Sequence, residues 1–318
     1  MTSVARPGRP RWYKPDTGLA VRMVLTMFLL GLVYVVFTGV LVRLGYGVIA
    51  IPFALIIAGT QLFFADKIAL ASMGAHDVDE SQAPELHDMV GRLAAQSGLP
   101  KPRIAIVNSS LPNAFATGRD KNHAVVAVTT GILSQLNPQE LEAVLAHELT
   151  HIINRDMLVM TIATFFSMVA GIITQNFLWL GMWGGGGYGR RRGNDGEGNA
   201  FILTLLVSAL VYAISFVLIR MLSRYRELAA DRGSALITGA PQNLASALLK
   251  LDALIRGGAA RIPQQDFRRA QTVNALFIVP ALRGDSLATL FSTHPSTEER
   301  VERLMAMQRQ MESAGYLS

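Results

Sequence analysis

The chain of 318 residues contains no cysteine, and charged residues make up only 16% of it. Without cysteine, neither a disulfide nor a thiolate-bound metal is possible, so any metal must bind to imidazole or carboxylate groups. The low charge, together with a hydrophobic content of 51%, argues against a simple soluble protein and favours a membrane protein. Histidine is also scarce, so each of the six histidines can be considered in turn as a metal ligand.

Basic residues are concentrated at the start of the chain, which has a net charge of +6. They lie within the first 22 residues, directly before an apolar run (Arg6, Arg9, Arg11, Lys14 and Arg22). Positive charge of this kind is typical of the cytoplasmic flank of a membrane helix. No RNA-binding motif and no basic stripe with interleaved aromatic residues accompanies it, so no nucleic-acid partner is expected. We therefore expect residues 1–22 to form a basic cytoplasmic N-terminus.

Two long apolar runs follow this basic start. Residues 23–42 and 44–65 contain no charged residue, and each run is long enough for a helix that crosses a bilayer. A cleaved signal peptide would leave the second run unexplained. The pattern predicts a transmembrane helical hairpin over residues 23–65.

Two further charge-free runs lie in the second half of the chain, at 157–183 and 200–219. Between them stands the sequence GGGGYGRRRGNDGEGN, which predicts a mobile loop over 184–199. Its three arginines would be disfavoured on the outer side of the membrane, where a spanning hairpin would place them. We expect a second apolar hairpin over 157–219 that spans the bilayer. The alternative is a hairpin that dips into the bilayer or packs on the soluble part.

Residues 76–156 have the pattern of a soluble α+β unit. The apolar residues of its first helix fall on one face (Leu86, Val90, Leu93 and Ala94). A short buried strand follows, and then a hairpin with its turn near 119–122 that ends in a strand over 123–129. Residues 220–318 predict a soluble part that is mostly helical.

The segment HELTH holds His147, Glu148 and His151 at the spacing of a metal site. It lies in a predicted helix that Asn137 can cap, so the two histidines project from one face and can bind a single ion. The glutamate between them is placed to act as a general base on a water without binding the metal itself. Chance alone would give this composition roughly 0.004 such matches. The segment therefore predicts a metal site rather than two surface histidines.

A catalytic metal bound in this way usually has three protein ligands and one open position. The downstream segment SRYRELAADRGSA places Glu227 and Asp231 four residues apart on one helical face. A carboxylate ligand and a second carboxylate that accepts a hydrogen bond from a ligand histidine would complete the site. The alternative is ordinary pairing of charges along a helix surface.

Several segments, in this order, resemble the HtpX family of membrane-bound zinc metalloproteases: NAFATG followed by AVVAVTTGIL, HELTHIINRD, SRYRELAADRGSA and STHPSTEERVERL. The resemblance covers essentially the whole chain. It implies one zinc ion per subunit, with Glu148 as the catalytic base. The zinc ligands that it implies are His147, His151 and Glu227, and the positions that would support them are Asp156 and Asp231.

The resemblance also implies a fold class and a setting. The expected fold is a mainly α membrane protein with four apolar helices in two hairpins and a cytoplasmic α+β, zincin-like (gluzincin) metalloprotease domain. The expected location is the lipid bilayer of a bacterial inner membrane, crossed several times. Misfolded or damaged membrane proteins and unfolded polypeptides would be its substrates. Other quality-control proteases of the membrane would be its partners.

His294 and one strand are further candidates for the site. His294 precedes a proline that can open the last helix, and it either packs there or stabilises the oxyanion of the reaction. The strand over 123–129 would offer an edge to which an extended substrate adds as a further strand, with the segment 113–118 nearby. The residues expected to contact the substrate are Asn113, Ala124, Val126 and Val128.

Three other functions compete with this interpretation. A zinc-stabilised membrane adaptor or holdase without turnover would not need Glu148. A transporter or channel usually carries charged groups inside its membrane segments, and these apolar runs have none. A CAAX prenyl protease shares the metal chemistry but is built from more membrane helices than this sequence predicts.

Overall fold

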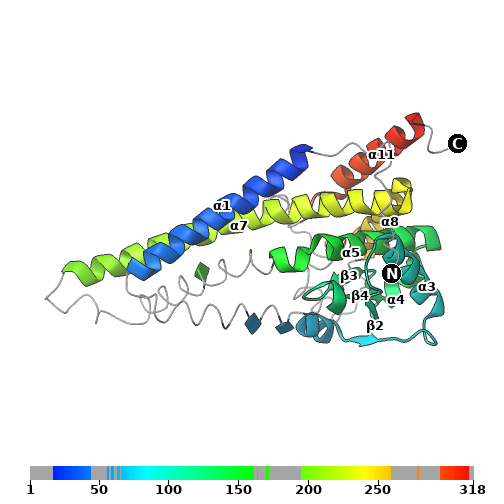
Figure 1. Ribbon diagram of the computed structural model, residues 1–318, viewed down its shortest axis with the longest axis horizontal. Coiled ribbons are helices and arrows are strands. Elements are labelled where there is room, and N and C mark those ends of the chain that lie inside the picture. Colours follow the sequence, from blue (N-terminus) through cyan, green and yellow to red (C-terminus); the bar gives the residue numbers. More distant parts are fainter. Residues whose placement is uncertain are drawn as a thin grey trace, which may run out of the picture. The chain divides into compact units, whose positions relative to one another are not determined.

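The computed structural model describes residues 17–43, 66–160, 195–258 and 294–314, together with residues 56, 59–60, 63–64, 163, 170–171 and 278. The chain divides into two units. The sheet unit comprises Met1–Leu19, Phe64–Leu158 and Arg224–Ser318, and the apolar unit comprises Ala20–Phe63 and Val159–Ser223. The fold is mostly helical, with one small sheet (Figure 1).

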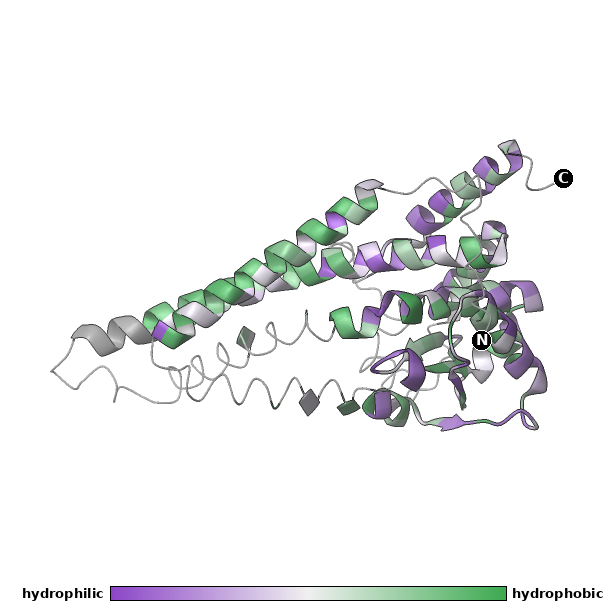
Figure 2. Cartoon of the chain, in the orientation of Figure 1, coloured by the Kyte–Doolittle hydropathy of each residue, from purple (hydrophilic) through white to green (hydrophobic). Residues whose placement is uncertain are grey.

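Two helices are long and apolar enough to cross a membrane. Helix α1 (Thr17–Arg43) contains a span over Thr17–Val40 with a mean hydropathy of 2.3, and helix α7 (Asp195–Thr238) contains one over Ile202–Thr238 with a mean hydropathy of 2.7. Apolar residues predominate along α1 and along the first half of the α7 span that begins at Ile202 (Figure 2). Many are exposed, among them Val35 at 71% and Leu206 at 62%, which a lipid environment explains.

The other two predicted apolar segments, 44–65 and 157–183, lie mostly outside the described residues, so the expected second helix of each hairpin stays a prediction. Most of the predicted loop over 184–199 lies there too. The predicted end of this loop at residue 199 is wrong, because helix α7 already begins at Asp195.

The sheet has four strands in the order β1-β2-β4-β3. Strand β2 (Arg103–Val107) lies between β1 (Ala75–Asp77), which is antiparallel to it, and β4 (Val125–Thr129), which is parallel to it. Strand β3 (Ala114–Thr117) pairs with β4 in an antiparallel register that sets Phe115 opposite Ala127. The predicted hairpin is therefore confirmed. Its turn contains a 3-10 helix, η1 (Lys121–His123).

The expectation that the strand over 123–129 forms an edge is wrong. Strand β4 is hydrogen-bonded to β2 on one side and to β3 on the other, and all five of its residues are buried, as is usual for a central strand. Val126 and Val128 therefore have no free backbone edge for a substrate, and the carbonyl oxygen of Ala124 accepts a hydrogen bond from the backbone of Arg103. Among the described strands, the edge on this side is β3.

Helices cover the sheet and complete the core. Helix α3 (Pro84–Gln96) buries the four residues predicted for its inner face, and helix α5 (Pro138–Asn154) packs against both β3 and α8 (Pro241–Gly258). The predicted cap of α5 is present, because Asn137 and Glu140 form a reciprocal capping box. Helix α4 (Thr130–Gln135) follows β4, and α11 (Thr297–Ser313) packs on α8. These contacts place α5 against the edge strand β3.

Candidate active site

Helices α5 and α7 bring three potential metal ligands together in the sheet unit. The Nε2 atoms of His147 and His151 on α5 lie 3.2 Å apart, and each lies 3.6 Å from one carboxylate oxygen of Glu227 on α7. All three ligand atoms fall within 4.8 Å of one another, and the three residues are almost fully buried. Four ligands placed tetrahedrally at zinc distances would be separated by about 3.3 Å. The group therefore has the size and the donor atoms of a zinc site.

Two carboxylates orient the imidazole rings of this group. Asp156 accepts a hydrogen bond of 2.6 Å from Nδ1 of His151, and Asp231 Oδ1 lies 3.0 Å from Nδ1 of His147, although off the direction of a regular hydrogen bond. With the Nδ1 protons held in this way, both Nε2 lone pairs face the same point. Lone pairs that face each other repel unless a proton or a metal ion lies between them.

The charges of the site favour a cation. Burial alone would lower the pKa of His147, but the nearby carboxylates of Asp231 and Glu227 raise it to about 9. Burial alone would likewise raise the pKa of Glu227, but the charge of His294 and contacts with the ligand histidines hold it well below its usual value. Glu227 therefore remains a carboxylate, the form that binds a metal.

Arg300, from the last helix, clamps the second carboxylate. Its Nε and Nη2 donate hydrogen bonds of 2.8 and 2.6 Å to the two oxygens of Asp231, and its Nη1 donates one of 2.7 Å to the carbonyl of Ile278. The side chain is fully buried, so this bidentate pair is shielded from solvent. Arg300 was not predicted from the sequence. It lies 69 residues from Asp231, and no spacing connects the two.

Glu148 lies between the metal-binding group and the edge strand. It is buried, and its Oε2 accepts a hydrogen bond of 2.9 Å from the backbone nitrogen of Ala116 in β3. Burial raises the pKa of Glu148, which brings its carboxylate closer to the basicity that a general base needs at neutral pH. Along a strand, the backbone N–H and C=O groups of every second residue point to the same side. Those of Ala114 therefore point away from β4, as those of Ala116 do.

The structure also places the two remaining predicted residues. His294 is buried just before α11, and its Nδ1 lies 3.4 Å from Glu227 Oε2, so it belongs to the surroundings of the metal-binding group. Asn113 is buried at the start of β3, and its side-chain oxygen accepts a hydrogen bond of 3.1 Å from the nitrogen of Ile278. The backbone nitrogen of Ile278 is thus held by Asn113 and its carbonyl by Arg300.

A sequence model of peptidase family M48 matches residues 80–308, which include all of these residues. The chain belongs to peptidase family M48. Curated relatives are similar over nearly their full length. The chain is 54% identical to the protease HtpX homolog of Moorella thermoacetica (93% of this chain, 97% of the relative). It is 46% identical to protease HtpX homolog 1 of Streptomyces coelicolor (92% and 93%).

Among solved structures, the crystal structure of S. mikatae Ste24p is similar to this M48 peptidase, with a TM-score of 0.51 and 18% identity over 91% of this chain and 67% of that one. This likeness concerns the fold. The resemblance to the HtpX family is confirmed by the relatives, and the chain is a membrane metalloprotease that needs a metal cofactor.

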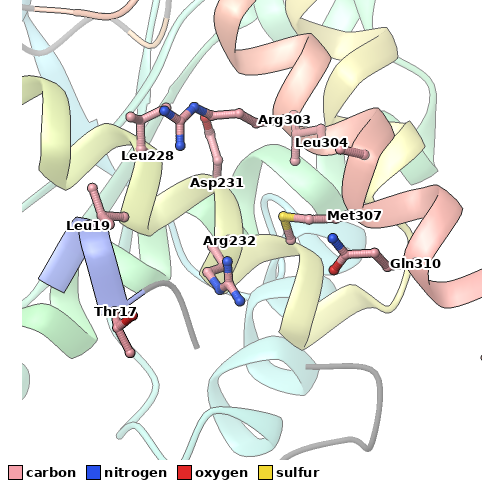
Figure 3. A pocket seen from close by; sticks show the side chains of 10 residues that line it. Thr17, Leu19, Leu228, Asp231, Arg232, Arg303, Leu304, Met307 and Gln310 are labelled. Atoms are coloured by element: carbon pink, nitrogen blue, oxygen red, sulfur yellow. The ribbon is translucent and has the colours of Figure 1, made fainter. Parts of the chain in front are cut away.

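One cavity of this M48 peptidase reaches the clamped carboxylate. It has a volume of about 390 Å³ and is lined by the start of α1, by α7 and by α11 (Figure 3). Asp231 contributes to its wall, together with the guanidinium groups of Arg232 and Arg303. Asp231 thus belongs both to this wall and to the surroundings of the ligand His147.

Proposed function

We propose that the chain is a zinc-dependent endopeptidase of a bacterial inner membrane that cleaves misfolded or damaged membrane proteins and unfolded polypeptides. The observation that carries this proposal is the convergence of two imidazoles and one carboxylate at zinc-ligand separations, beside a buried glutamate and an edge strand. His147, His151 and Glu227 would hold the zinc ion, and Asp231 and Asp156 would orient the two rings.

A bound zinc ion would polarise the scissile carbonyl and make the attacking water more acidic. Glu148 takes the proton of this water on its carboxylate and passes it to the leaving amine. A raised pKa suits both steps, because the group must accept the proton and release it again. Asp156 and Asp231 keep the Nδ1 protons in place, so both ligand rings present Nε2 throughout.

The substrate is proposed to bind as an extended segment along β3 rather than along β4. The outward backbone groups of Ala114 and the carbonyl of Ala116 would pair with it, as in other complexes in which a peptide adds to a sheet edge, while the Ala116 nitrogen remains bonded to Glu148. Folded proteins cannot present an extended segment, so unfolded or flexible regions are the expected substrates.

A cytoplasmic location of the sheet unit is proposed from the basic N-terminus. His151 precedes the apolar run 157–183, and Glu227 follows the run 200–219. Because both residues belong to one ligand group, the chain between them must leave the site and return to the same side. This supports a second apolar hairpin over 157–219.

The decisive experiment uses the purified full-length protein in detergent with casein and a model membrane protein as substrates. Cleavage should stop when a chelator removes zinc, return when zinc is added, and be lost in Glu148→Gln with zinc still bound. Cleavage by zinc-loaded Glu148→Gln at the wild-type rate would refute this mechanism. Zinc binding by the wild type without any cleavage would instead indicate a metal-stabilised adaptor.

A further inference from the structure

A pocket of the sheet unit lies beside the ligand His151, where the edge strand ends. Its wall includes His151 itself, Thr117 and Gly118 at the end of β3, Lys121 from the turn after β3, and Arg155 from the end of α5. A peptide paired along β3 with its scissile carbonyl at the metal would extend past Thr117 into this pocket. What binds there therefore bears on the choice of substrate, and this inference rests on the proposed endopeptidase function.

The pocket carries an uncompensated positive charge. Lys121 and Arg155 have no ion-pair partner within the described part of the chain. Asp120 also lines the pocket, but its carboxylate accepts hydrogen bonds from His123 Nδ1 and from the backbone nitrogens of Asn122 and His123. Arg119 lies 3.5 Å from the same carboxylate. Asp120 is thus occupied locally, and Lys121 and Arg155 remain in the lining of the pocket without an ion-pair partner among the described residues.

Arg155 stands at this position in an unfavourable backbone conformation. It ends α5 with φ 57° and ψ 37°, the left-handed region, and it is the only residue other than glycine with positive φ among those that the structure describes. Glycine or asparagine usually occupies this end position, and a side chain such as arginine costs about 1 kcal/mol there. Strain of this kind is concentrated at functional sites, which fits a role for the guanidinium group in the pocket.

We propose that this pocket binds an acidic side chain of the substrate and that the enzyme therefore prefers aspartate or glutamate at one fixed position near the scissile bond. Lys121 and Arg155 reach the pocket from two sides, from the turn after β3 and from the end of α5. A carboxylate between them would form charge-assisted hydrogen bonds, which are stronger than those of a neutral amide of the same shape.

The test compares peptides that differ only by glutamate or glutamine at each position around one cleavage site. The zinc-loaded wild type should cleave the glutamate peptide about tenfold faster in kcat/KM at one position and equally fast at the others. The double variant Lys121→Gln, Arg155→Asn should lose this preference. Asparagine tolerates the left-handed conformation, so the end of α5 is kept. The reversed variant Lys121→Glu, Arg155→Glu should prefer lysine at the same position.

Arg92→Gln is the matched control, because it removes one exposed positive charge on α3 that does not line the pocket. It should keep the wild-type preference, and bound zinc is measured in every variant so that metal loss is recognised. Glu148-dependent cleavage without any acidic preference, or with a preference that survives in the double variant, would overturn the pocket proposal and leave the protease function standing. The absence of all Glu148-dependent cleavage would overturn both.

Discussion

At the scale of single residues, the site is a chain of buried charges that begins at the metal ligands. His147 contacts Asp231, and Arg300 clamps Asp231 with two hydrogen bonds. A buried pair of this kind is costly to break, because removing one partner leaves the other charge without compensation. The carboxylate of Asp231 is therefore required both for the orientation of the ligand and for the burial of Arg300.

Asp231→Asn should weaken zinc binding by about 10- to 100-fold, because a neutral amide orients the imidazole of His147 poorly and removes the bidentate carboxylate partner of Arg300. The measurement is a zinc titration of the purified protein against a competing chelator. Asp77→Asn, which removes an exposed carboxylate of β1, is the control and should bind zinc like the wild type. Unchanged zinc affinity in Asp231→Asn would show that the carboxylate does not support the ligand.

At the scale of elements, the site depends on the close approach of α5 and α7. A Cβ at Gly233 of α7 would lie 2.3 Å from Cγ2 of Thr150 on α5, and Ser234 donates a hydrogen bond of 2.7 Å to the carbonyl of Ala143. Because Glu227 lies on α7 and both ligand histidines lie on α5, this contact sets the separation of the ligands.

Gly233→Ala should therefore separate the two helices. We expect a loss of about 1–3 kcal/mol in the free energy of unfolding and weaker zinc binding, measured by denaturant unfolding and by zinc titration. Gly91→Ala on α3 is the control, because a Cβ there meets nothing closer than 3.8 Å, and alanine should leave stability unchanged or improve it. Equal behaviour of the two variants would contradict the role of the close contact.

The start of α5 predicts a dependence of stability on pH. Burial by itself would raise the pKa of Glu140, but hydrogen bonds from Lys250, Asn137 and Ser246 bring it below its usual value. A carboxyl group with a lowered pKa in the folded state stabilises the protein above its unfolded pKa. That contribution is lost as the pH falls through the folded value.

Glu140→Gln should accordingly unfold more easily than the wild type at pH 7, by about 1–2 kcal/mol. The difference should shrink as the pH falls below about 4.5, because the wild-type carboxylate becomes protonated. Unfolding by denaturant at several pH values tests this, with the exposed Glu85 changed to glutamine as control. A difference that stays constant over the whole range would refute the electrostatic explanation.

At the scale of the whole molecule, the ligands come from segments that are far apart in the chain. His147 and His151 precede the apolar run 157–183, and Glu227 follows the run 200–219 on the same helix α7 that contains the second apolar span. A metal bound to all three residues would cross-link the sheet unit across this interval, so metal binding and folding are coupled.

Removal of zinc should therefore lower the thermal stability of the protein. Free zinc at 100 times Kd would contribute about 2.7 kcal/mol, and Tm should rise with zinc concentration in the wild type. The same measurement on Glu227→Ala should show a much smaller rise, because one ligand is missing. An equal zinc response of both proteins would remove Glu227 from the ligand set.

Sequence alone was sufficient for the local features. The cap of α5, the buried face of α3, the β3–β4 hairpin and the pattern of His147, Glu148 and His151 depend on residues within one or two turns or strands of each other. Such short-range patterns survive in the sequence because the period of a helix or strand decides which side chains share a face.

Tertiary structure alone decided which strand forms the edge, which arginine holds Asp231, and that Arg155 and Lys121 line one pocket. Strand β4 became central because β2, 22 residues earlier at Arg103 and Val125, pairs with it in parallel, while β3 takes the outer place. These arrangements depend on which distant segments pack together. No spacing along the chain records that choice, because it follows from the burial of the whole core and not from any one element.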